Sequence, residues 1–365
     1  MQTFAAQRFR FLESPHDPPQ DRSEMSATLR DVARLAGVHT ATAARALSAS
    51  GRDKVAAATR AKVEAAARSL GYTANATAAS LRTGRSGVVG MLVPDIANPL
   101  FAPMLQGAER RLRESGWTLL LAQADPSDAN RLALLQTLLE RRVDGLIVAS
   151  SLTEDPVLDL LHARGVPTVL VNRGMGERRF SSVVNDDAQS MQLAVAHLRG
   201  LGHAHLLHLA GPRNSSTGRS REAAFRQFAQ SRAEVVVAGH YTIEAGRQAM
   251  QAYLARPAAR RTASGIVAAN DLIALGAIEA IEAAGARVPR DFSVVGHNDT
   301  GFMDRVDPPL TTVRLAIGSM GAQAAELLIQ LMQSPAAQRP SPSTRLLHPE
   351  LVVRSSTARV TSRVR

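Results

Sequence analysis

The chain has 365 residues, of which 45% are hydrophobic and 21% are charged, a composition typical of a globular protein with two or three domains. No apolar run reaches the roughly 18 residues that a membrane span needs, and the N-terminus lacks the apolar region of a secretory signal, which argues against a membrane or exported protein. Since there is no cysteine, disulfide and thiolate chemistry are excluded, and we expect a cytoplasmic protein.

The net charge of +11 is unevenly distributed along the chain. Residues 26–85 carry ten bases and three acids, whereas residues 86–350 together are close to neutral. A short basic segment of this kind is the electrostatic footprint of a nucleic-acid-binding region. We therefore expect the N-terminal part to bind DNA and the larger remainder to have a different task.

Residues 1–26 mix Pro, Asp, Gln and Ser without periodicity, and we expect a disordered N-terminal extension. Met25 comes just before the first predicted helix and is a second candidate for the native start, which N-terminal mass spectrometry of the native protein would decide.

Residues 28–47 predict two short helices joined by a tight turn. Apolar residues from Leu29 to Ala36 recur at the spacing of one buried helix face, Gly37 provides the turn, and a second helix is expected over 40–47. A third helix is expected over 57–69, although Ala56 lacks the capping hydroxyl, a loss of about 1 kcal/mol. A glycine turn between two short helices places the second helix in a DNA major groove, so we assign residues 27–72 to a helix-turn-helix DNA-binding domain.

From residue 88 onward, strand-like and helix-like segments alternate, which indicates parallel sheets with helices on both faces. Two such sets predict two α/β lobes, with the boundary between Asn172 and Asp187, and residues 310–313 are expected to return to the first lobe. We assign residues 73–87 to a hinge helix and linker, 88–354 to the core and 355–365 to a basic tail. Strands are expected over 88–94, 117–122, 145–149, 168–172, 205–211, 265–269 and 293–297, and helices over 101–115, 130–142, 156–164, 187–201, 221–230, 245–254, 272–284 and 319–332.

Several motifs, in this order, resemble the lactose/galactose repressor (LacI/GalR) family of bacterial transcription regulators. They include DVARLAGV followed by TAARAL, GYTANATAASLRTGRSG, VPDIANPLF, RRVDGLIV, AANDLIALGAIEAI, and VPRDFSVVGHND with DPPLTTVR. The resemblance implies an all-α helix-turn-helix headpiece and an α/β core like periplasmic binding proteins, built of two doubly wound lobes. It further implies a homodimer that binds operator DNA and a small effector, with no cofactor, no metal and no enzymatic activity.

The resemblance also implies which side chains meet DNA. Arg45 is expected to contact a base, because a guanidinium matches the O6/N7 edge of guanine, the alternative being a contact with phosphate or solvent. Thr42 is expected to donate to a phosphate. Leu81 matches the leucine that wedges into a minor-groove step, in a hinge where Ala74 replaces the usual proline. The complete predicted DNA-binding set is Thr28, His39, Thr40, Ala41, Thr42, Arg45, Asn75 and Leu81.

Open α/β lobes bind ligands at the carboxyl ends of their strands, where this sequence places mainly Asn and Asp. The resemblance implies that Asn172, Arg221, Asn270 and Asn298 line the cleft and that Phe101 supplies an apolar face. With the strand-end residues Asp95 and Asn98, the predicted effector-binding set is Asp95, Asn98, Phe101, Asn172, Arg221, Asn270 and Asn298. Such side chains suit a sugar or a sugar acid, and Arg221, expected in the first turn of its helix, favours an acidic sugar as a hypothesis. Asp271 is expected to cap a helix and Asp299 a turn, which leaves Asn270 for the ligand.

The function predicted from the sequence is an effector-controlled repressor, with two alternatives from other classes of protein. A periplasmic-type sugar-binding protein fits the core but not the basic head. A metabolic enzyme is disfavoured, because no Gly-rich phosphate loop appears. Of His203, His205 and His208 on a predicted strand edge, only His203 and His205 share one face, and no third metal ligand is evident. His197 is expected to be structural. The absence of a sustained heptad pattern disfavours a coiled-coil tetramer.

Overall fold

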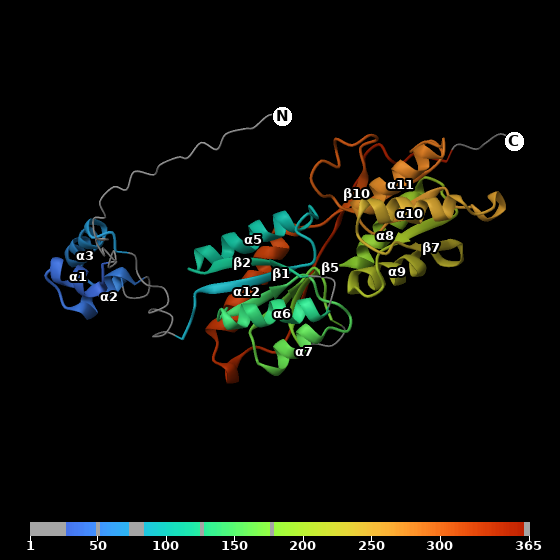
Figure 1. The fold of residues 1–365 in the computed structure, drawn as a ribbon. Helices are drawn as coiled ribbons and strands as arrows, with labels where there is room; N and C mark the ends of the chain where they lie inside the picture. The colour runs from blue at the N-terminus through green and yellow to red at the C-terminus, as the bar shows by residue number, and fades with distance from the viewer. Residues whose placement is uncertain (1–26, 49–51, 73–83, 125–127, 176–178, 361–365) are drawn as a thin grey trace, which may run out of the picture. The chain divides into compact units, whose positions relative to one another are not determined.

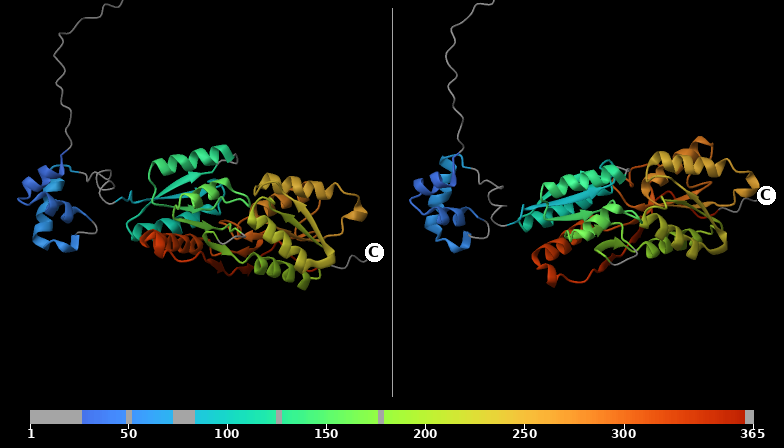
Figure 2. Two further views of the ribbon diagram at one scale, coloured as in Figure 1. Left: turned by 90° about the horizontal axis from the view of Figure 1, so that it is seen from below. Right: turned by 60° about the horizontal axis from the view of Figure 1, so that its bottom comes forward.

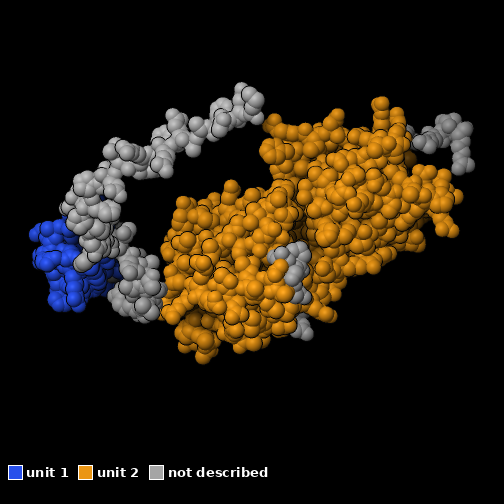
Figure 3. All heavy atoms as spheres, in the orientation of Figure 1, with its two compact units in different colours: residues 1–78 blue, residues 79–365 orange. Residues whose placement is uncertain are grey.

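The computed structural model describes residues 27–48, 52–72, 84–124, 128–175 and 179–360. The chain divides into two compact units, residues 1–78 and residues 79–365 (Figure 3). The predictions made for the N-terminal extension and for Asn75 and Leu81 lie outside the described residues. None of the helices described has both the length and the apolar character that a membrane span requires.

The first unit is a small helical domain, and its three predicted helices are confirmed. They are α1 (Leu29–Leu35), α2 (Thr40–Leu47) and α3 (Ala57–Ser69), with a 3₁₀ turn at Arg52–Lys54. Gly37 has φ +65°, a left-handed conformation that a residue with a side chain adopts only with strain. Val32, Ala43 and Val63, one from each helix, are completely buried at the centre. As expected, no side chain caps the start of α3.

The first lobe of the second unit is built on a six-stranded sheet of order β11-β5-β4-β3-β1-β2, in which every neighbouring pair is parallel. One face packs against α5 and α12, and the other packs against α6 and α7 (Figures 1 and 2). The elements are β1 (Val88–Val93), α5 (Phe101–Glu114), β2 (Thr118–Gln123), α6 (Asp128–Glu140), β3 (Gly145–Val148), α7 (Pro156–Ala163), β4 (Thr168–Val171), β5 (Ser181–Asn185), α12 (Ile317–Gln333) and β11 (Thr344–Leu347).

The second lobe repeats this plan on a sheet of order β12-β10-β9-β8-β6-β7, where only the pairing of β12 with β10 is antiparallel. Helices α8 and α9 pack against one face, and α10 and α11 pack against the other. The elements are α8 (Asp187–Gly200), β6 (Leu206–Ala210), α9 (Ser216–Ala229), β7 (Ala233–Val237), α10 (Ile243–Leu254), β8 (Gly265–Ala268), α11 (Asp271–Ala283), β9 (Ser293–Asn298), β10 (Thr311–Arg314) and β12 (Glu350–Val352).

The chain passes between the lobes three times: from β5 to α8, from β10 to α12, and from β11 to β12. The first passage lies within the boundary expected from the sequence. The expectation that residues 310–313 return to the first lobe is wrong, because β10 pairs with β9 in the second sheet. The strand that returns is β11, which lies parallel to β5.

The residues expected to begin a basic tail instead complete the second lobe. Ser356 is fully buried, its hydroxyl accepts a hydrogen bond from Thr311 N at 2.8 Å, and it donates to the carbonyl of Val294 at 2.6 Å. Val360 N donates to the carbonyl of Leu201. The core therefore extends at least to residue 360. This extension was not predicted because the segment alternates short polar and apolar residues and packs mainly through backbone hydrogen bonds.

Candidate functional site

The exposed surface of helix α2 consists of one basic side chain and of small side chains. Ala43 and Ala46 are buried against the other helices, whereas Ala41 and Arg45 are exposed, and the helix carries no acidic residue. Arg45 Nε donates to the carbonyl of Ala41 at 3.2 Å, a contact that leaves other guanidinium nitrogens available. Among the residues of this unit whose side chains are described, the exposed bases are Arg30, Arg34, Arg45, Lys54, Lys62 and Arg68.

Two residues predicted to meet DNA also cap helices. Thr28 and Asp31 form a capping box at α1, in which each side chain bonds the backbone of the other, and the hydrogen bonds from Thr28 lower the pKa of the Asp31 carboxyl. His39 Nδ1 accepts a hydrogen bond from Ala41 N at 3.2 Å and so caps α2 in place of a hydroxyl residue. Neither cap was predicted from the sequence, although a Thr three residues before an Asp is a recognisable capping pattern.

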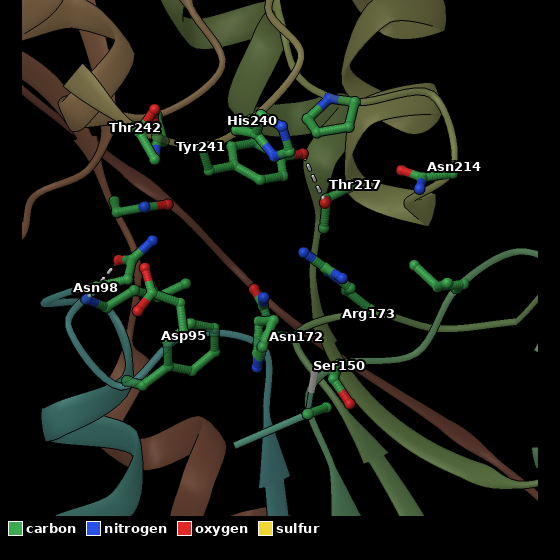
Figure 4. A pocket seen from close by; sticks show the side chains of 18 of the residues that line it. Asp95, Asn98, Ser150, Asn172, Arg173, Asn214, Thr217, His240, Tyr241 and Thr242 are labelled. Carbon is green, nitrogen blue, oxygen red and sulfur yellow. Dashed lines mark hydrogen bonds between the residues drawn. The ribbon is translucent and has the colours of Figure 1, made fainter. Parts of the chain in front are cut away.

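A cavity of about 260 Å³ lies between the two lobes of the second unit (Figure 4). All seven residues predicted to bind an effector line it, four of them from the first lobe, Asp95, Asn98, Phe101 and Asn172, and three from the second, Arg221, Asn270 and Asn298. They come from strand ends or from the helices that follow, which is where open α/β sheets place ligands. Residues separated by up to two hundred positions are thereby brought to one site.

The loop after β1 supplies an acidic and an amide side chain. Asp95 Oδ1 accepts a hydrogen bond from Ala97 N at 2.9 Å, and Asn98 Oδ1 accepts one from Leu100 N at 3.0 Å. These bonds hold both side chains in the loop that leads to Phe101, the first residue of α5, whose side chain is buried. Residues 95–101 therefore provide both polar groups and an apolar surface to the cavity.

Two asparagines at strand ends have left-handed backbone conformations. Asn172, directly after β4, has φ 64°, and Asn298, the last residue of β9, has φ 117°. Asparagine tolerates such conformations better than most residues, and backbone strain of this kind clusters at functional sites. Both side chains are buried at the cavity wall, and Asn298 Oδ1 lies 3.0 Å from Nδ1 of His297.

Arg221 lines the cavity but is already neutralised by the protein. Its Nε donates to Asp187 Oδ1 at 2.8 Å, and its Nη1 donates to the carbonyl of Ala269 at 2.6 Å. Burial raises the pKa of Asp187, while the guanidinium opposes that shift and keeps the two charges paired. Because α9 begins at Ser216, Arg221 lies in the second turn, so the expectation of a first-turn position is wrong.

The helix cap that was expected from Asp271 is provided by Asn270. Asn270 Oδ1 accepts a hydrogen bond from Ile273 N at 2.8 Å and caps α11, while the residue still lines the cavity. Asp271 accepts three hydrogen bonds, two from Thr300 and one from Thr312, and complete burial raises its pKa to about 6. The capping role expected for Asp271 is therefore wrong, because only the tertiary fold brings these two threonines to it.

Asp299 also departs from expectation. Its carboxylate forms ion pairs with Arg314 and Arg354, each at 2.7 Å, instead of capping a turn.

The cavity also contains residues that the sequence analysis missed. From the first lobe come Arg131, Ser150 and Arg173, and from the second come Asn214, Thr217, His240, Tyr241 and Thr242. The Tyr241 hydroxyl lies 2.9 Å from that of Thr217. Arg173 follows Asn172 at the end of a predicted strand, a position that could have suggested it, but nothing local marks the others.

The histidines have structural surroundings. His197 forms a hydrogen bond with Thr357, and His203 forms one with Ser264. Since β6 begins at Leu206, His203 and His205 are not on the strand where they were expected. His208 is fully buried on β6 and stacks on Phe225. Among the residues with described positions, no group of three His, Cys, Asp or Glu side chains is arranged to hold a metal ion.

Comparison with known proteins places this geometry in a family. The model for bacterial regulatory proteins of the lacI family matches residues 28–75, and a periplasmic binding protein-like domain matches residues 195–357. The HTH-type transcriptional regulator MalR of Streptomyces coelicolor is 35% identical over 349 residues, covering 92% of this chain and 97% of the relative. The chain belongs to the LacI family of bacterial transcriptional regulators.

Solved structures of LacI-family proteins agree with this assignment. The lac repressor dimer bound to operator and the anti-inducer ONPF aligns with a TM-score of 0.78 at 29% identity, covering 91% of this chain and 99% of that one. The complex of the transcriptional regulator CelR with cellobiose aligns with a TM-score of 0.67 at 29% identity, covering 90% and 99% of the two chains. The predicted family and fold class are therefore confirmed: a helix-turn-helix headpiece joined to a two-lobed α/β core, in a DNA-binding transcriptional regulator.

Proposed function

We propose that this LacI-family regulator is a repressor, active in the cytoplasm as a homodimer, whose operator affinity is controlled by a small sugar or sugar-acid effector. One observation carries the proposal: polar side chains from both lobes converge on a single cavity in a chain that also has a basic helix-turn-helix head. The lac repressor dimer bound to operator and the cellobiose complex of CelR support both halves of it.

In this proposal the head, residues 27–72, reads DNA with α2, and residues 73–87 form the hinge to the core. Arg45 contacts a base, Thr40 and Ala41 complete the reading surface, and Thr42 with the helix caps Thr28 and His39 contacts the backbone. Two heads related by two-fold symmetry would bind a nearly palindromic operator, because closed two-fold assembly is the commonest arrangement of soluble oligomers. Asn75 and Leu81 contribute minor-groove contacts at the hinge.

The effector binds in the cavity between the lobes. Asparagine side chains there donate and accept hydrogen bonds, as ligand hydroxyl groups require, and the Phe101 ring provides an apolar surface. A volume of about 260 Å³ is slightly below the roughly 300–1,000 Å³ typical of small-molecule sites, which favours a compact ligand. The effector alters DNA binding only to the extent that it binds one of two core conformations more tightly.

The decisive experiment measures DNA binding of the full chain by fluorescence anisotropy, using duplexes from upstream of its own gene and an unrelated duplex as control. The logarithm of the association constant should fall with the logarithm of the salt concentration, with a slope of about −0.9 per phosphate contacted. A subset of duplexes should bind more tightly than the control. An exported sugar-binding protein predicts sugar binding without any salt-dependent DNA binding. That result would refute the proposed function.

A further inference from the structure

Three guanidinium groups line the cavity, and two of them have carboxylate partners within the protein. Arg131 Nη2 lies 2.5 Å from Asp155 Oδ2, and Arg221 Nε lies 2.8 Å from Asp187 Oδ1. All four side chains are mostly buried. Each of these cations therefore brings its own counter-charge to the site.

Arg173 has no such partner. Its side chain belongs to a residue that is only 9% exposed, yet no carboxylate of the described chain lies within ion-pairing distance of it. Its Nε is buried without a hydrogen bond, and its Nη1 reaches the carbonyl of Ser151 only at 3.5 Å. The remaining compensation is the ring of Tyr241 from the other lobe, whose centroid lies 6.0 Å from the guanidinium carbon.

The surroundings make this charge costly. Burial lowers the pKa of Arg173, and the neighbouring charges of Arg131 and Arg221 lower it further, against opposing effects of Tyr241 and Asp155. An arginine still stays ionised in a protein, so the cost falls on the folded state. In the same cavity, the hydroxyl of Ser150 is also buried without a hydrogen-bond partner. The surroundings of Arg173 thus contain three cations, two carboxylates that are each paired with another arginine, and a hydroxyl without a partner, while Asp95 is a further carboxylate at the first-lobe end of the cavity.

We propose that the effector is a monosaccharide-sized sugar acid whose carboxylate is bound by Arg173. This inference rests on the proposed function and narrows its effector class. Figure 4 shows the Arg173 side chain extending into the cavity toward Thr217 and Tyr241 of the second lobe. A planar carboxylate matches the two-pronged donor geometry of a guanidinium and would supply the missing counter-charge.

The arrangement favours a carboxylate over a phosphate, and Arg173 over Arg221 as the anion-binding residue. One unpaired cation balances a single negative charge, whereas a phosphate dianion would leave excess negative charge near Asp155 and Asp95. Arg221 is already paired with Asp187 and is left to orient the ligand. At the first-lobe end, Asp95 and Asn98 are placed to bond the hydroxyl groups of the same molecule.

The test is isothermal titration calorimetry of the full chain with four acids, gluconate, galactonate, glucuronate and galacturonate. Glucose and galactose serve as neutral counterparts, and glucose 6-phosphate as the phosphate arm. At least one acid should bind, and more tightly than its neutral counterpart. Arg173→Gln should weaken that binding about 30-fold or more, and Arg173→Lys should restore only part of it, because a lysine lacks the two-pronged geometry. The matched control is Arg164→Gln, an exposed arginine of the same lobe, which should bind as the wild type does.

A second measurement needs no ligand. Arg173→Met should raise the midpoint of thermal unfolding of the ligand-free protein or leave it unchanged, because it removes a buried charge that has no partner. Arg131→Met should lower the midpoint, because it strands Asp155. Equal losses in the two variants would overturn the proposal, since they would mean that the protein itself compensates Arg173.

The outcomes separate this inference from the function on which it rests. One outcome is salt-dependent operator binding that responds to glucose or to glucose 6-phosphate, with no binding of any acid. This outcome refutes the assignment of a sugar acid as the effector and supports the proposed function as a DNA-binding regulator. Binding of an acid that is unaffected by Arg173→Gln refutes the role of Arg173. An acid that binds tightly to a protein without affinity for DNA refutes the proposed function and leaves the assignment of the cavity.

Discussion

Replacing the buried histidine of β6 should change how the stability of the core depends on pH. His208 is completely buried, stacks on Phe225 with ring centroids 5.0 Å apart, and forms one hydrogen bond through Nδ1 to the carbonyl of Val267. Its Nε2 has no partner, and burial lowers its pKa to about 4. The folded protein therefore holds this ring neutral at every pH where the unfolded chain begins to protonate it.

The direction and size of the effect follow from the two pKa values. Above about pH 6.5, the ordinary histidine pKa, both states are neutral and the residue has no pH-dependent effect. As the pH falls from 6.5 toward 4, only the unfolded state takes up the proton, so stability is lost. At pH 5 the loss relative to pH 7.5 is about 2 kcal/mol for a folded pKa of about 4.

The assay is urea unfolding at pH 7.5 and pH 5 for the wild type and for His208→Phe, which keeps a ring against Phe225 but cannot ionise. The free-energy difference between the two proteins should shift by about 2 kcal/mol in favour of the variant at the lower pH. Other titrating groups, including Asp271, are common to both proteins and cancel in this difference. His205→Gln, at an exposed histidine just before the same strand, serves as the control. A difference that stays constant with pH would show that His208 titrates normally and that the burial argument is wrong.

Three further predictions concern the head and the cavity. Arg45→Ala should lower discrimination at one operator base pair by about 1–3 kcal/mol, measured by anisotropy titrations with single-base operator variants. The control Arg68→Ala on α3 should not change this base preference. An unchanged base preference in Arg45→Ala would contradict the proposal that α2 binds in the major groove. Thr28→Ala should cost the head about 1 kcal/mol of unfolding free energy by removing the capping box, and wild-type stability in thermal denaturation would refute that role. Arg221→Gln and Asp187→Asn should each destabilise the core by about 3–5 kcal/mol, with the double variant costing much less than the sum; strict additivity in urea unfolding would mean that the pair is not coupled.

Elements with a local signal could be predicted from the amino-acid sequence alone. The helices of the head follow from apolar spacing, the turn at Gly37 and the residues at their ends, and they lie where they were predicted. Most of the buried parallel strands were equally visible, because each is an apolar run between two helical segments. The exception is β5 (Ser181–Asn185), which begins with two serines and was not predicted, although it is buried between two parallel neighbours. Since parallel strands place their carboxyl ends at one edge of a sheet, five of the predicted effector-binding residues could be named from strand ends before their distances were known. The other two, Phe101 and Arg221, were named from the resemblance to the family.

Features that depend on partners distant in the chain could not be predicted and became visible in the folded protein. Strands β11 and β12 lie at sheet edges, where one face meets solvent and the sequence needs no apolar run, so their place could not be read locally. Asp271 became an acceptor for Thr300 and Thr312 instead of a helix cap, because the fold closes around it. The charge balance of the cavity was decided in the same way. Whether a buried arginine is paired depends on which carboxylate the packing brings within about 3 Å of it, and no spacing along the chain encodes that distance.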